Sequence, residues 1–512
     1  MLAKTYGAAI FGVNATMITI EVTVGQGANT YLVGLPDSAV KESVQRVEAA
    51  IKYHDYFYPR NKTVINLAPA DVRKEGSAYD LPMALCILHS SGQVTLPSLE
   101  EYVIMGELSL DGKLRPIKGV LPIAIEARKN RYKGFLLPKE NAEEASIVNN
   151  LDVIGVESLQ EAVDFLRGKI AIQPTVSDTR DLFLSTLNEY ETDFADVQGQ
   201  ENIKRALEIA AAGGHNVIMI GPPGAGKTML AKRLPGILPP LTLQEALETT
   251  KIHSVAGKLG TRATLISRRP FRNPHHTISD AALVGGGGAP SPGEISLAHN
   301  GVLFLDELPE FKRSALEVMR QPLEERTVSI SRARWAVEFP ASFMLISSMN
   351  PCPCGYYNHP EKECTCPPGA VAKYLSKISG PLLDRIDLHV EVTPVNFEQL
   401  SSTRKAEPSS VIRERVIQAR ERQTERFSDH PGIYANAMMP SEMVRKVCEL
   451  SDAGKMLLKT AMTRLQLSAR AYDRILRVAR TIADLAASPD IKIEHIAEAI
   501  QYRSLDRESW GS

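Results

Sequence analysis

A glycine-rich octapeptide lies near the middle of the 512-residue chain and reads Gly221-Pro222-Pro223-Gly224-Ala225-Gly226-Lys227-Thr228. It follows an apolar run at residues 217–220 and precedes a helical pattern at residues 229–234, which is the strand, loop and helix order that a phosphate-binding loop requires. Glycines in such a loop allow backbone N–H groups to surround phosphates. We predict that Lys227 reaches the terminal phosphates of ATP and that Thr228 binds Mg²⁺. The alternative is a glycine turn that arose by chance.

Two adjacent carboxylates, Asp306 and Glu307, follow a second buried strand predicted at residues 302–305. Ligands of open α/β sheets bind at the carboxyl ends of the strands. We therefore expect Asp306 to hold Mg²⁺ through its water shell, and Glu307 to polarise the attacking water as a general base. A solvated acidic turn is the alternative, which the phosphate-binding loop upstream disfavours.

Three further polar residues are candidates for the same reaction. Asn350 follows a third predicted strand at residues 343–347 and is placed to orient the water, or is an ordinary turn asparagine. Arg385 lies on a short loop before the next strand, where it can serve the ATP of a neighbouring subunit or form an ordinary salt bridge. Arg470 begins a helix near the C-terminus and is a candidate γ-phosphate contact, for which Arg474 is the competing choice.

The composition is that of an ordinary globular protein with several domains. Its 59 basic and 60 acidic residues give a net charge of −1, so no global field attracts the chain to DNA or to an anionic membrane. No apolar run approaches the ~20 residues needed to cross a bilayer, and the N-terminus does not resemble a signal peptide. We therefore predict no membrane partner and a cytoplasmic location.

Strand and helix patterns alternate over most of the chain and predict an α/β fold with three domains. The first covers residues 1–175. It contains a helix predicted from apolar residues at helical spacing after Asp37, and Asp37 is the predicted cap of that helix. The second covers residues 183–395 and places the phosphate-binding loop in a parallel sheet covered by helices. The third covers residues 411–505 and is helical. Polar stretches between the domains indicate two linkers.

Four of the six cysteines form two Cys-x-Cys pairs that are close in the sequence, namely Cys352 with Cys354 and Cys364 with Cys366. Four thiolates are suited to a tetrahedral Zn²⁺ site. His359 offers a substitute ligand, and free reduced thiols are the alternative. Because the cluster directly follows Asn350, bound zinc would brace a loop beside the nucleotide.

These blocks together resemble the AAA+ ATPases of the magnesium chelatase group and, more closely, the YifB/ComM family, described as magnesium-chelatase-like DNA helicases. The similarity covers nearly the whole chain. Its most specific part is the series RPFRNPHHT at residues 269–277, ALVGGGGAP at 282–290 and PGEISLAH at 292–299. The resemblance implies a hexameric ring that uses ATP. It makes Lys227 the Walker lysine, Asp306 and Glu307 the Walker acidic pair, Asn350 the first sensor, Arg385 the arginine finger and Arg470 the second sensor.

A β-hairpin is predicted at residues 328–339, with Arg332 and Arg334 at its tip. In related AAA+ helicases a hairpin before the first sensor points into the pore, where arginines can bind DNA phosphates and six copies would form a basic channel. A solvated charged turn is the alternative. The segment at residues 271–276 is a candidate second pore element, and its paired histidines are alternatively a metal site.

The N-terminal domain resembles the proteolytic domain of the Lon proteases, which has a ribosomal S5 domain 2-like fold, through residues 74–82 and 106–119. Aligning the first of these motifs places Ala78 at the position of the Lon nucleophile, although Ser77 lies one residue away, and aligning the second places Leu121 at the position of the Lon lysine. A catalytic serine needs a base, and leucine cannot accept a proton. We predict a non-proteolytic binding or assembly domain.

The function that these features favour is ATP-driven movement of a homohexamer on single-stranded or branched DNA. Such a helicase would unwind duplexes or migrate branches during recombination or transformation. The alternative is a motor that remodels a protein or metallates a macrocycle, as the magnesium chelatase ATPase does. The Lon-like domain and the cysteine cluster favour the helicase.

Overall fold

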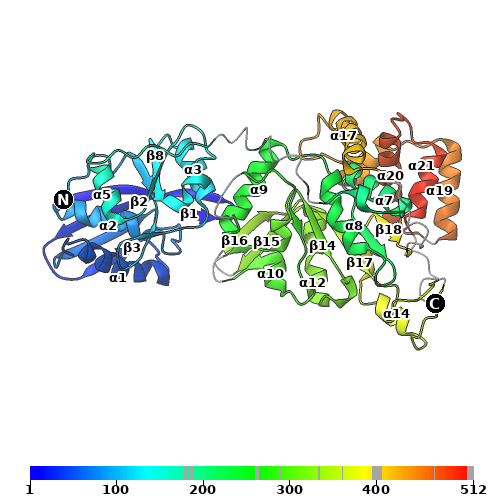
Figure 1. Ribbon diagram of the computed structural model, residues 1–512, viewed down its shortest axis with the longest axis horizontal. Coiled ribbons are helices and arrows are strands. Elements are labelled where there is room, and N and C mark those ends of the chain that lie inside the picture. The colour runs from blue at the N-terminus through cyan, green and yellow to red at the C-terminus, as the bar shows by residue number, and fades with distance from the viewer. Residues whose placement is uncertain are drawn as a thin grey trace.

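The computed structural model describes residues 1–177, 183, 190, 192–259, 265–287, 290–332, 335–359, 361–394, 406–465 and 467–503. The molecule is elongated, with the N-terminal region at one end, α9 and the hairpin of residues 327–340 in the middle and the C-terminal helices at the other end (Figure 1). Among the described residues, none of the helices combines the length and the apolar character that crossing a membrane requires.

A seven-stranded sheet of mixed direction forms the N-terminal region, with the strand order β3-β4-β2-β1-β5-β8-β9. These strands are β1 (Leu2–Phe11), β2 (Asn14–Gly25), β3 (Thr30–Val33), β4 (Lys62–Ala68), β5 (Tyr102–Ile104), β8 (Gly134–Pro138) and β9 (Asp152–Val156). The helices are α1 (Ser38–Tyr53), α2 (Asp80–Ser90), α3 (Val120–Lys129), α4 (Ala142–Ala145) and α5 (Leu159–Leu166), and β6 (Glu107–Leu108) pairs with β7 (Leu114–Arg115).

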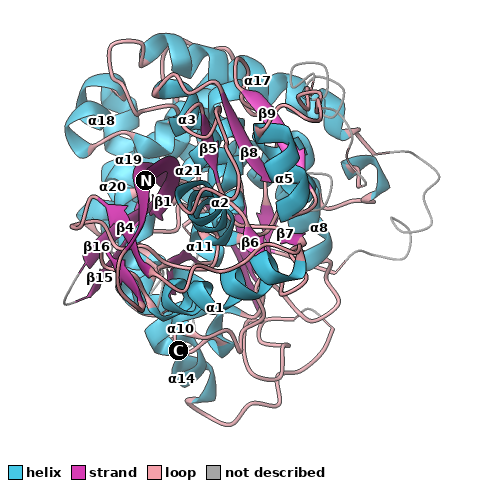
Figure 2. Ribbon diagram, turned by 90° about the vertical axis from the view of Figure 1, so that its left-hand side faces the viewer, coloured by secondary structure: helices cyan, strands magenta, loops and turns pink. Residues whose placement is uncertain are grey.

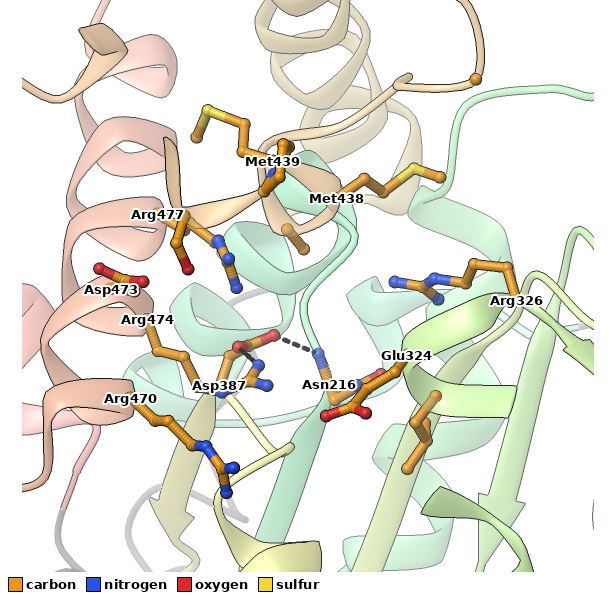
Figure 3. Close-up of a pocket in the computed structure, with 15 residues that line it drawn as sticks. Asn216, Glu324, Arg326, Asp387, Met438, Met439, Arg470, Asp473, Arg474 and Arg477 are labelled. Atoms are coloured by element: carbon orange, nitrogen blue, oxygen red, sulfur yellow. Dashed lines mark hydrogen bonds and ion pairs between the residues drawn. The ribbon is translucent and has the colours of Figure 1, made fainter. Parts of the chain in front are cut away.

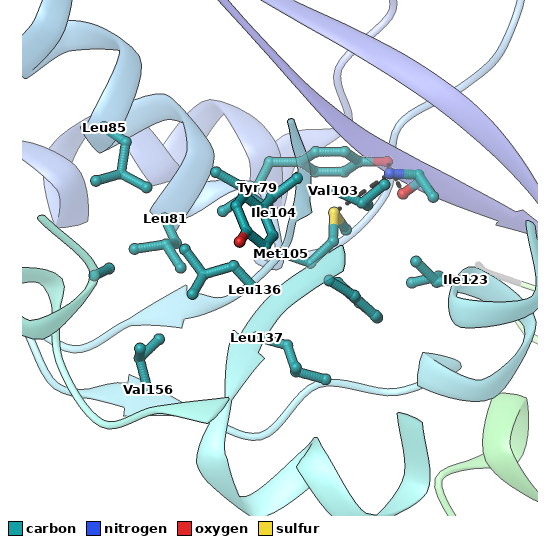
Figure 4. Packing of buried hydrophobic residues seen from close by; sticks show 14 of the residues in the cluster. Tyr79, Leu81, Leu85, Val103, Ile104, Met105, Ile123, Leu136, Leu137 and Val156 are labelled. Carbon is teal, nitrogen blue, oxygen red and sulfur yellow. Dashed lines mark hydrogen bonds between the residues drawn. The ribbon is translucent and has the colours of Figure 1, made fainter. Parts of the chain in front are cut away.

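The core of this region follows the predicted pattern. Alternate residues of β2 are fully buried, and apolar side chains of α2, β5 and β8 pack together (Figure 4). The predicted cap of α1 is confirmed, because the Asp37 carboxylate accepts the N–H of Val40 at 2.8 Å. Strand β1 was not predicted. Gly7, Ala8 and Ala9 have low strand propensity, so β1 depends on its pairing with β2 and β5 on either side.

The central sheet has five parallel strands in the order β11-β14-β17-β10-β18. They are β10 (Val217–Ile220), β11 (Phe271–Arg272), β14 (Val302–Leu305), β17 (Met344–Met349) and β18 (Leu388–Glu391). All residues of β10, β14 and β17 are buried, which is why these strands are continuous apolar runs in the sequence. The predicted α/β class with a parallel sheet is confirmed.

Helices and two hairpins surround this sheet. The helices are α7 (Glu201–Gly213), α8 (Lys227–Arg233), α9 (Leu243–Ala256), α10 (Asp280–Val284), α11 (Glu294–Leu297), α12 (Arg313–Val318), α13 (Arg320–Glu325), α14 (Ala370–Leu375) and α15 (Gly380–Leu383). The hairpins are β12 (Gly285–Gly286) with β13 (Ser291–Pro292), and β15 (Thr327–Arg332) with β16 (Trp335–Pro340). The second is the predicted hairpin, and it lies at the edge of the molecule (Figure 2).

The C-terminal region is helical, as predicted, and packs on α7. It contains α17 (Ser409–Arg426), α18 (Ser441–Val447), α19 (Asp452–Arg464), α20 (Ala469–Leu485) and α21 (Ile493–Gln501). Short 3-10 turns lie at Lys139–Asn141, Phe194–Asp196, Leu234–Ile237, Leu308–Glu310 and Asn436–Met438.

The three regions share apolar contacts. Leu241, Ala246 and Leu265 belong to the core of the N-terminal region, and a second core joins the central sheet to the C-terminal helices. The buried Glu144 of the first region also accepts a hydrogen bond from Ser254 of α9. These contacts cross the predicted domain boundaries and do not by themselves define the domains, so the predicted domain ranges stay a prediction.

Candidate nucleotide site and cysteine cluster

The phosphate-binding loop connects β10 to α8, so that Lys227 is the first residue of the helix. Its Nζ donates to the carbonyl oxygens of Gly221 at 2.7 Å and Pro222 at 3.0 Å, and to Asn350 Oδ1 at 3.2 Å. Gly224 and Gly226 have φ angles of +79° and +86°, a backbone conformation that glycine adopts without strain. Burial lowers the pKa of Lys227, although Asp306 and Glu307 oppose that effect.

The predicted Mg²⁺ ligands lie together. Thr228 Oγ1 donates to Asp306 Oδ2 at 2.7 Å, and the Ser348 hydroxyl donates to the other oxygen of this carboxylate. The N–H of Glu307 also donates to Asp306, at 3.1 Å. The hydroxyl of Thr228 in the first turn of α8 and the carboxylate of Asp306 after β14 are oxygen ligands of the kind that Mg²⁺ accepts, so these residues fit the ion.

His276 lies beside the predicted base, which sequence reasoning did not anticipate. Its Nδ1 is 3.5 Å from Glu307 Oε2, and the Glu307 side chain is 58% exposed. The pairing of β11 with β14 would have predicted this contact. Because the two strands are parallel neighbours, residues that follow each of them lie at the same edge of the sheet. The alternative of a metal site at the paired histidines gains no support. Among the described residues, the group that brings three or more metal-ligand atoms together is the cysteine cluster, and it does not include these histidines.

Arg385 and Arg470 lie at the opposite edge of the sheet, near the amino ends of the strands. Arg385 is 7% exposed and its Nη2 lies 2.5 Å from Glu324 Oε1. Arg470 Nη1 lies 3.5 Å from Asp384 Oδ2, beside the same loop. Since β10 and β18 are parallel and in register over four residues, roughly 13 Å of strand separates this loop from the phosphate-binding loop. Neither arginine therefore lies beside the chain's own Lys227.

A cavity of about 470 Å³ opens at this second edge, between α20 and the sheet (Figure 3). Arg470, Arg474, Arg477 and Arg326 are among its lining residues. Asp387 balances part of this charge, because it accepts hydrogen bonds from Arg474 and from the N–H of Asn216.

The Asp387 carboxylate is fully enclosed. Burial by itself would raise its pKa, but the adjacent Arg474 and His215 outweigh that effect and hold the pKa well below its ordinary value. His215 Nδ1 lies 3.3 Å from Asp387 Oδ2. The carboxylate thus connects α20 to the beginning of β18, the strand that follows Arg385.

Comparison with known proteins found similar sequences over nearly the whole chain. Family profiles match residues 193–400 (magnesium chelatase, subunit ChlI), residues 20–141 (subunit ChlI of Mg-chelatase) and residues 406–503 (magnesium chelatase, subunit ChlI C-terminal). The uncharacterized protein YifB of Escherichia coli is 44% identical over 511 residues, which is 99% of this chain and 98% of that protein. Competence protein ComM of Haemophilus influenzae is 43% identical over 509 residues, with the same shares of each chain.

The chain belongs to the YifB/ComM family of magnesium-chelatase-like proteins. Membership indicates an AAA+ ATPase and implies ATP and Mg²⁺ as its nucleotide and ion. The likeness to Lon is also found. Lon protease 2 of Bacillus subtilis is 33% identical over 159 residues, which cover 28% of this chain and 27% of that protein.

In this family member, the Lon-like region does not pair a serine with a lysine at the expected place. Ala78 is partly buried and Leu121 is fully buried at the two aligned positions. The nearby Ser77 hydroxyl donates to Glu107, and the buried Lys74 donates its Nζ to the Pro69 carbonyl. The absence of peptidase activity stays a prediction.

The four cysteines that the sequence singled out form one cluster. Their Sγ atoms all lie within 4.8 Å of one another, and His359 is not part of the group. The sulfur of Cys352 lies 3.3 Å from that of Cys354 and 3.7 Å from that of Cys364. Four sulfurs about 2.3 Å from a central Zn²⁺ would be about 3.8 Å apart, so the cluster fits this ion. Hydrogen bonds from the Tyr356 N–H and from neighbouring groups lower the pKa of Cys354 to about 5, whereas neighbouring thiols raise the pKa values of Cys364 and Cys366.

The hairpin that carries the predicted DNA contacts is present. Arg332 is the last residue of β15 and pairs with Trp335 across the hairpin. Arg334 lies outside the described residues. The turn between β1 and β2 touches this hairpin, because a methyl group at Gly12 would lie 3.3 Å from the Glu338 carbonyl oxygen.

Proposed function

We propose that this chain is an ATP-driven motor that acts in the cytoplasm on single-stranded or branched DNA as a homohexamer. Its role would be helicase or branch-migration activity in DNA recombination or natural transformation. The relation to a competence protein over the full length supports this role. The observation that carries the ring-shaped ATPase of this proposal is the separation of Lys227 from Arg385 and Arg470 at opposite edges of one sheet.

Separation of the two groups supports a ring, because a complete ATP site would then need two subunits. Head-to-tail contacts would bring the phosphate-binding loop of one subunit to the arginine edge of the next, and such heterologous contacts form a ring when the rotation between neighbours closes. Arg385 would leave Glu324 to contact the neighbour's γ-phosphate, and Arg470 would reach it from α20. An arginine in this position stabilises the charge that develops during phosphoryl transfer.

In the proposed site, residues at the carboxyl ends of the strands would each have a separate role in hydrolysis. The loop from Gly221 to Thr228 would bind the phosphates, with Lys227 moving its hydrogen bonds from backbone carbonyls to phosphate oxygens. Glu307 would accept a proton from the attacking water, and Asn350 would orient that water. Mg²⁺ held by Thr228 and Asp306 would supply neutralising charge on the phosphate oxygens. We also assign Zn²⁺ to the four cysteines as a structural ion.

Contact with DNA is assigned to the hairpin of β15 and β16, with Arg332 and Arg334 binding phosphates. The test is the steady-state ATPase rate at low salt, with and without single-stranded and forked DNA, for wild type and for Arg332→Ala with Arg334→Ala. DNA should stimulate the wild type and not the double variant. Lys455→Ala with Lys459→Ala is a matched control, because it removes two exposed positive charges from α19 and should keep the stimulation.

The absence of stimulation by any DNA, together with a normal basal ATPase rate, would refute the DNA motor. That result would favour the second candidate, a motor that remodels a protein or acts as the chelatase ATPase does. The family profiles, which carry the name of a magnesium chelatase subunit, are the observation that favours this candidate.

A further inference from the structure

The loop that carries the cysteines contacts the phosphate-binding loop at two points. Asn350, at its beginning, accepts a hydrogen bond from Lys227 at 3.2 Å. Gly355, between the two cysteine pairs, packs on Pro223, so closely that a methyl group at Gly355 would lie 2.6 Å from Pro223 Cδ. At this point the two loops are too close to admit even one additional carbon atom without a shift.

The position of Gly355 depends on the cysteines around it. Its N–H donates to the carbonyl oxygen of Cys352 at 3.0 Å, and the N–H of Tyr357 donates to Cys352 Sγ at 3.3 Å. Cys352 is fully buried, whereas the other three cysteines of the cluster are partly exposed. The turn that touches Pro223 is thus built directly on one sulfur of the cluster.

Bound metal would fix this turn in a way that the thiols cannot. The two cysteine pairs have no covalent bond to each other, since all four are free thiols. A metal ion with four thiolate ligands closes the loop between the pairs and reduces the conformations open to it. The chain between Cys354 and Cys364 would then hold Gly355 against Pro223 as one rigid unit.

We propose that zinc bound by the four cysteines positions the phosphate-binding loop through the contact between Gly355 and Pro223, so that zinc occupancy controls the affinity for ATP. The inference rests on the zinc site proposed above and does not depend on DNA. It makes the cysteine cluster a regulatory element of the nucleotide site as well as a structural one.

Two glycines of the same loop allow a matched steric test. Gly355 and Gly369 have φ angles of +85° and +76°, so alanine introduces similar backbone strain at both positions. A methyl group at Gly355 meets Pro223, whereas at Gly369 it meets no atom within 4 Å. Gly355→Ala should therefore retain zinc and weaken ATP binding by about tenfold, and Gly369→Ala should retain both zinc and affinity.

The measurements are zinc content, by release to a chromogenic chelator, and equilibrium affinity for a fluorescent ATP analogue. Cys352→Ser with Cys364→Ser should lose zinc and bind the analogue about tenfold more weakly. Pro223→Ala removes the atoms that the new methyl would meet. The double variant with Gly355→Ala should therefore bind the analogue as Pro223→Ala alone does.

Three outcomes would overturn the inference. The purified wild type could contain no zinc, the zinc-free variant with Cys352→Ser and Cys364→Ser could bind the analogue with wild-type affinity, or Gly355→Ala could retain both full zinc and wild-type affinity. If the cysteine variant fails to fold, the Gly355→Ala and Gly369→Ala pair still tests the contact with Pro223, and wild type from which the chelator has removed zinc tests the zinc dependence, with wild-type affinity after removal overturning the inference. DNA stimulation measured on the same preparations separates the two proposals. Its absence beside a clear effect of Gly355→Ala would refute the DNA motor and leave the zinc coupling standing.

Discussion

Mixing two inactive variants, Lys227→Ala and Arg385→Ala, is expected to restore ATP hydrolysis. The first variant loses the phosphate contact of its own site and keeps the arginine edge, and the second has the reverse defect. Roughly 13 Å of strand separates the two edges, so in the proposed ring the ATP of one subunit would contact Lys227 of that subunit and Arg385 of the next. A mixed ring would therefore contain complete sites that neither variant would form alone.

The size of the recovery follows from this geometry. In rings assembled at random from equal amounts, about half of the phosphate-binding loops are intact, and about half of the arginine edges that face them are intact. About one quarter of the sites are then complete, which predicts about one quarter of the wild-type rate if the sites act independently.

The assay is phosphate release after subunit exchange, with co-assembly verified by capture of an affinity tag that only one variant carries. A mixture of Lys227→Ala with the Lys227→Ala and Arg385→Ala double variant is the control, because it contains no intact loop and should stay inactive. Co-assembled rings of the two single variants that hydrolyse no more ATP than the separate proteins would refute the reasoning. Both residues would then serve the site of the same subunit.

Three further variants test individual residues. Glu307→Gln removes the proposed base and should lower kcat about 100-fold or more while the affinity for an ATP analogue is retained, and a wild-type kcat would assign the base elsewhere. Asp387→Asn tests the pH dependence of stability by thermal unfolding. Because the pKa of Asp387 in the folded chain is lower than its ordinary value of 3.8, the charged carboxylate stabilises the fold at pH values above 3.8, and this stabilisation is lost as the pH falls below 3.8. The wild type should be the more stable at pH 7, with a difference that narrows below about pH 4, and a constant difference would contradict this. Phe304→Ala removes a fully buried ring stacked on Phe271 and should lower the free energy of unfolding by about 3–5 kcal/mol in denaturant titrations. The exposed Phe57→Ala should change that energy by less than about 0.5 kcal/mol, and similar losses for both would contradict the assigned packing.

The sequence by itself determined the features that depend on neighbouring residues. Glycine spacing and an apolar strand identified the loop that ends at Thr228, because a phosphate-binding loop is a local backbone conformation. Asp37 was recognised as a helix cap from the residues that follow it. Buried parallel strands were recognised as continuous apolar runs, and the cysteine cluster was recognised because its two pairs are close in the chain.

Only the tertiary structure decided which distant residues meet. Strand order brings His276 to Glu307, since β11 and β14 are neighbours in the sheet although 29 residues lie between Arg272 at the end of β11 and Val302 at the start of β14. Strand direction places Arg470 at the edge opposite Lys227, a relation that helix periodicity cannot supply. The contact of Gly355 with Pro223 likewise arises from packing between loops that follow different strands. Sequence patterns report local conformation and burial, whereas the pairing of strands and the packing of loops depend on the free energy of the whole fold.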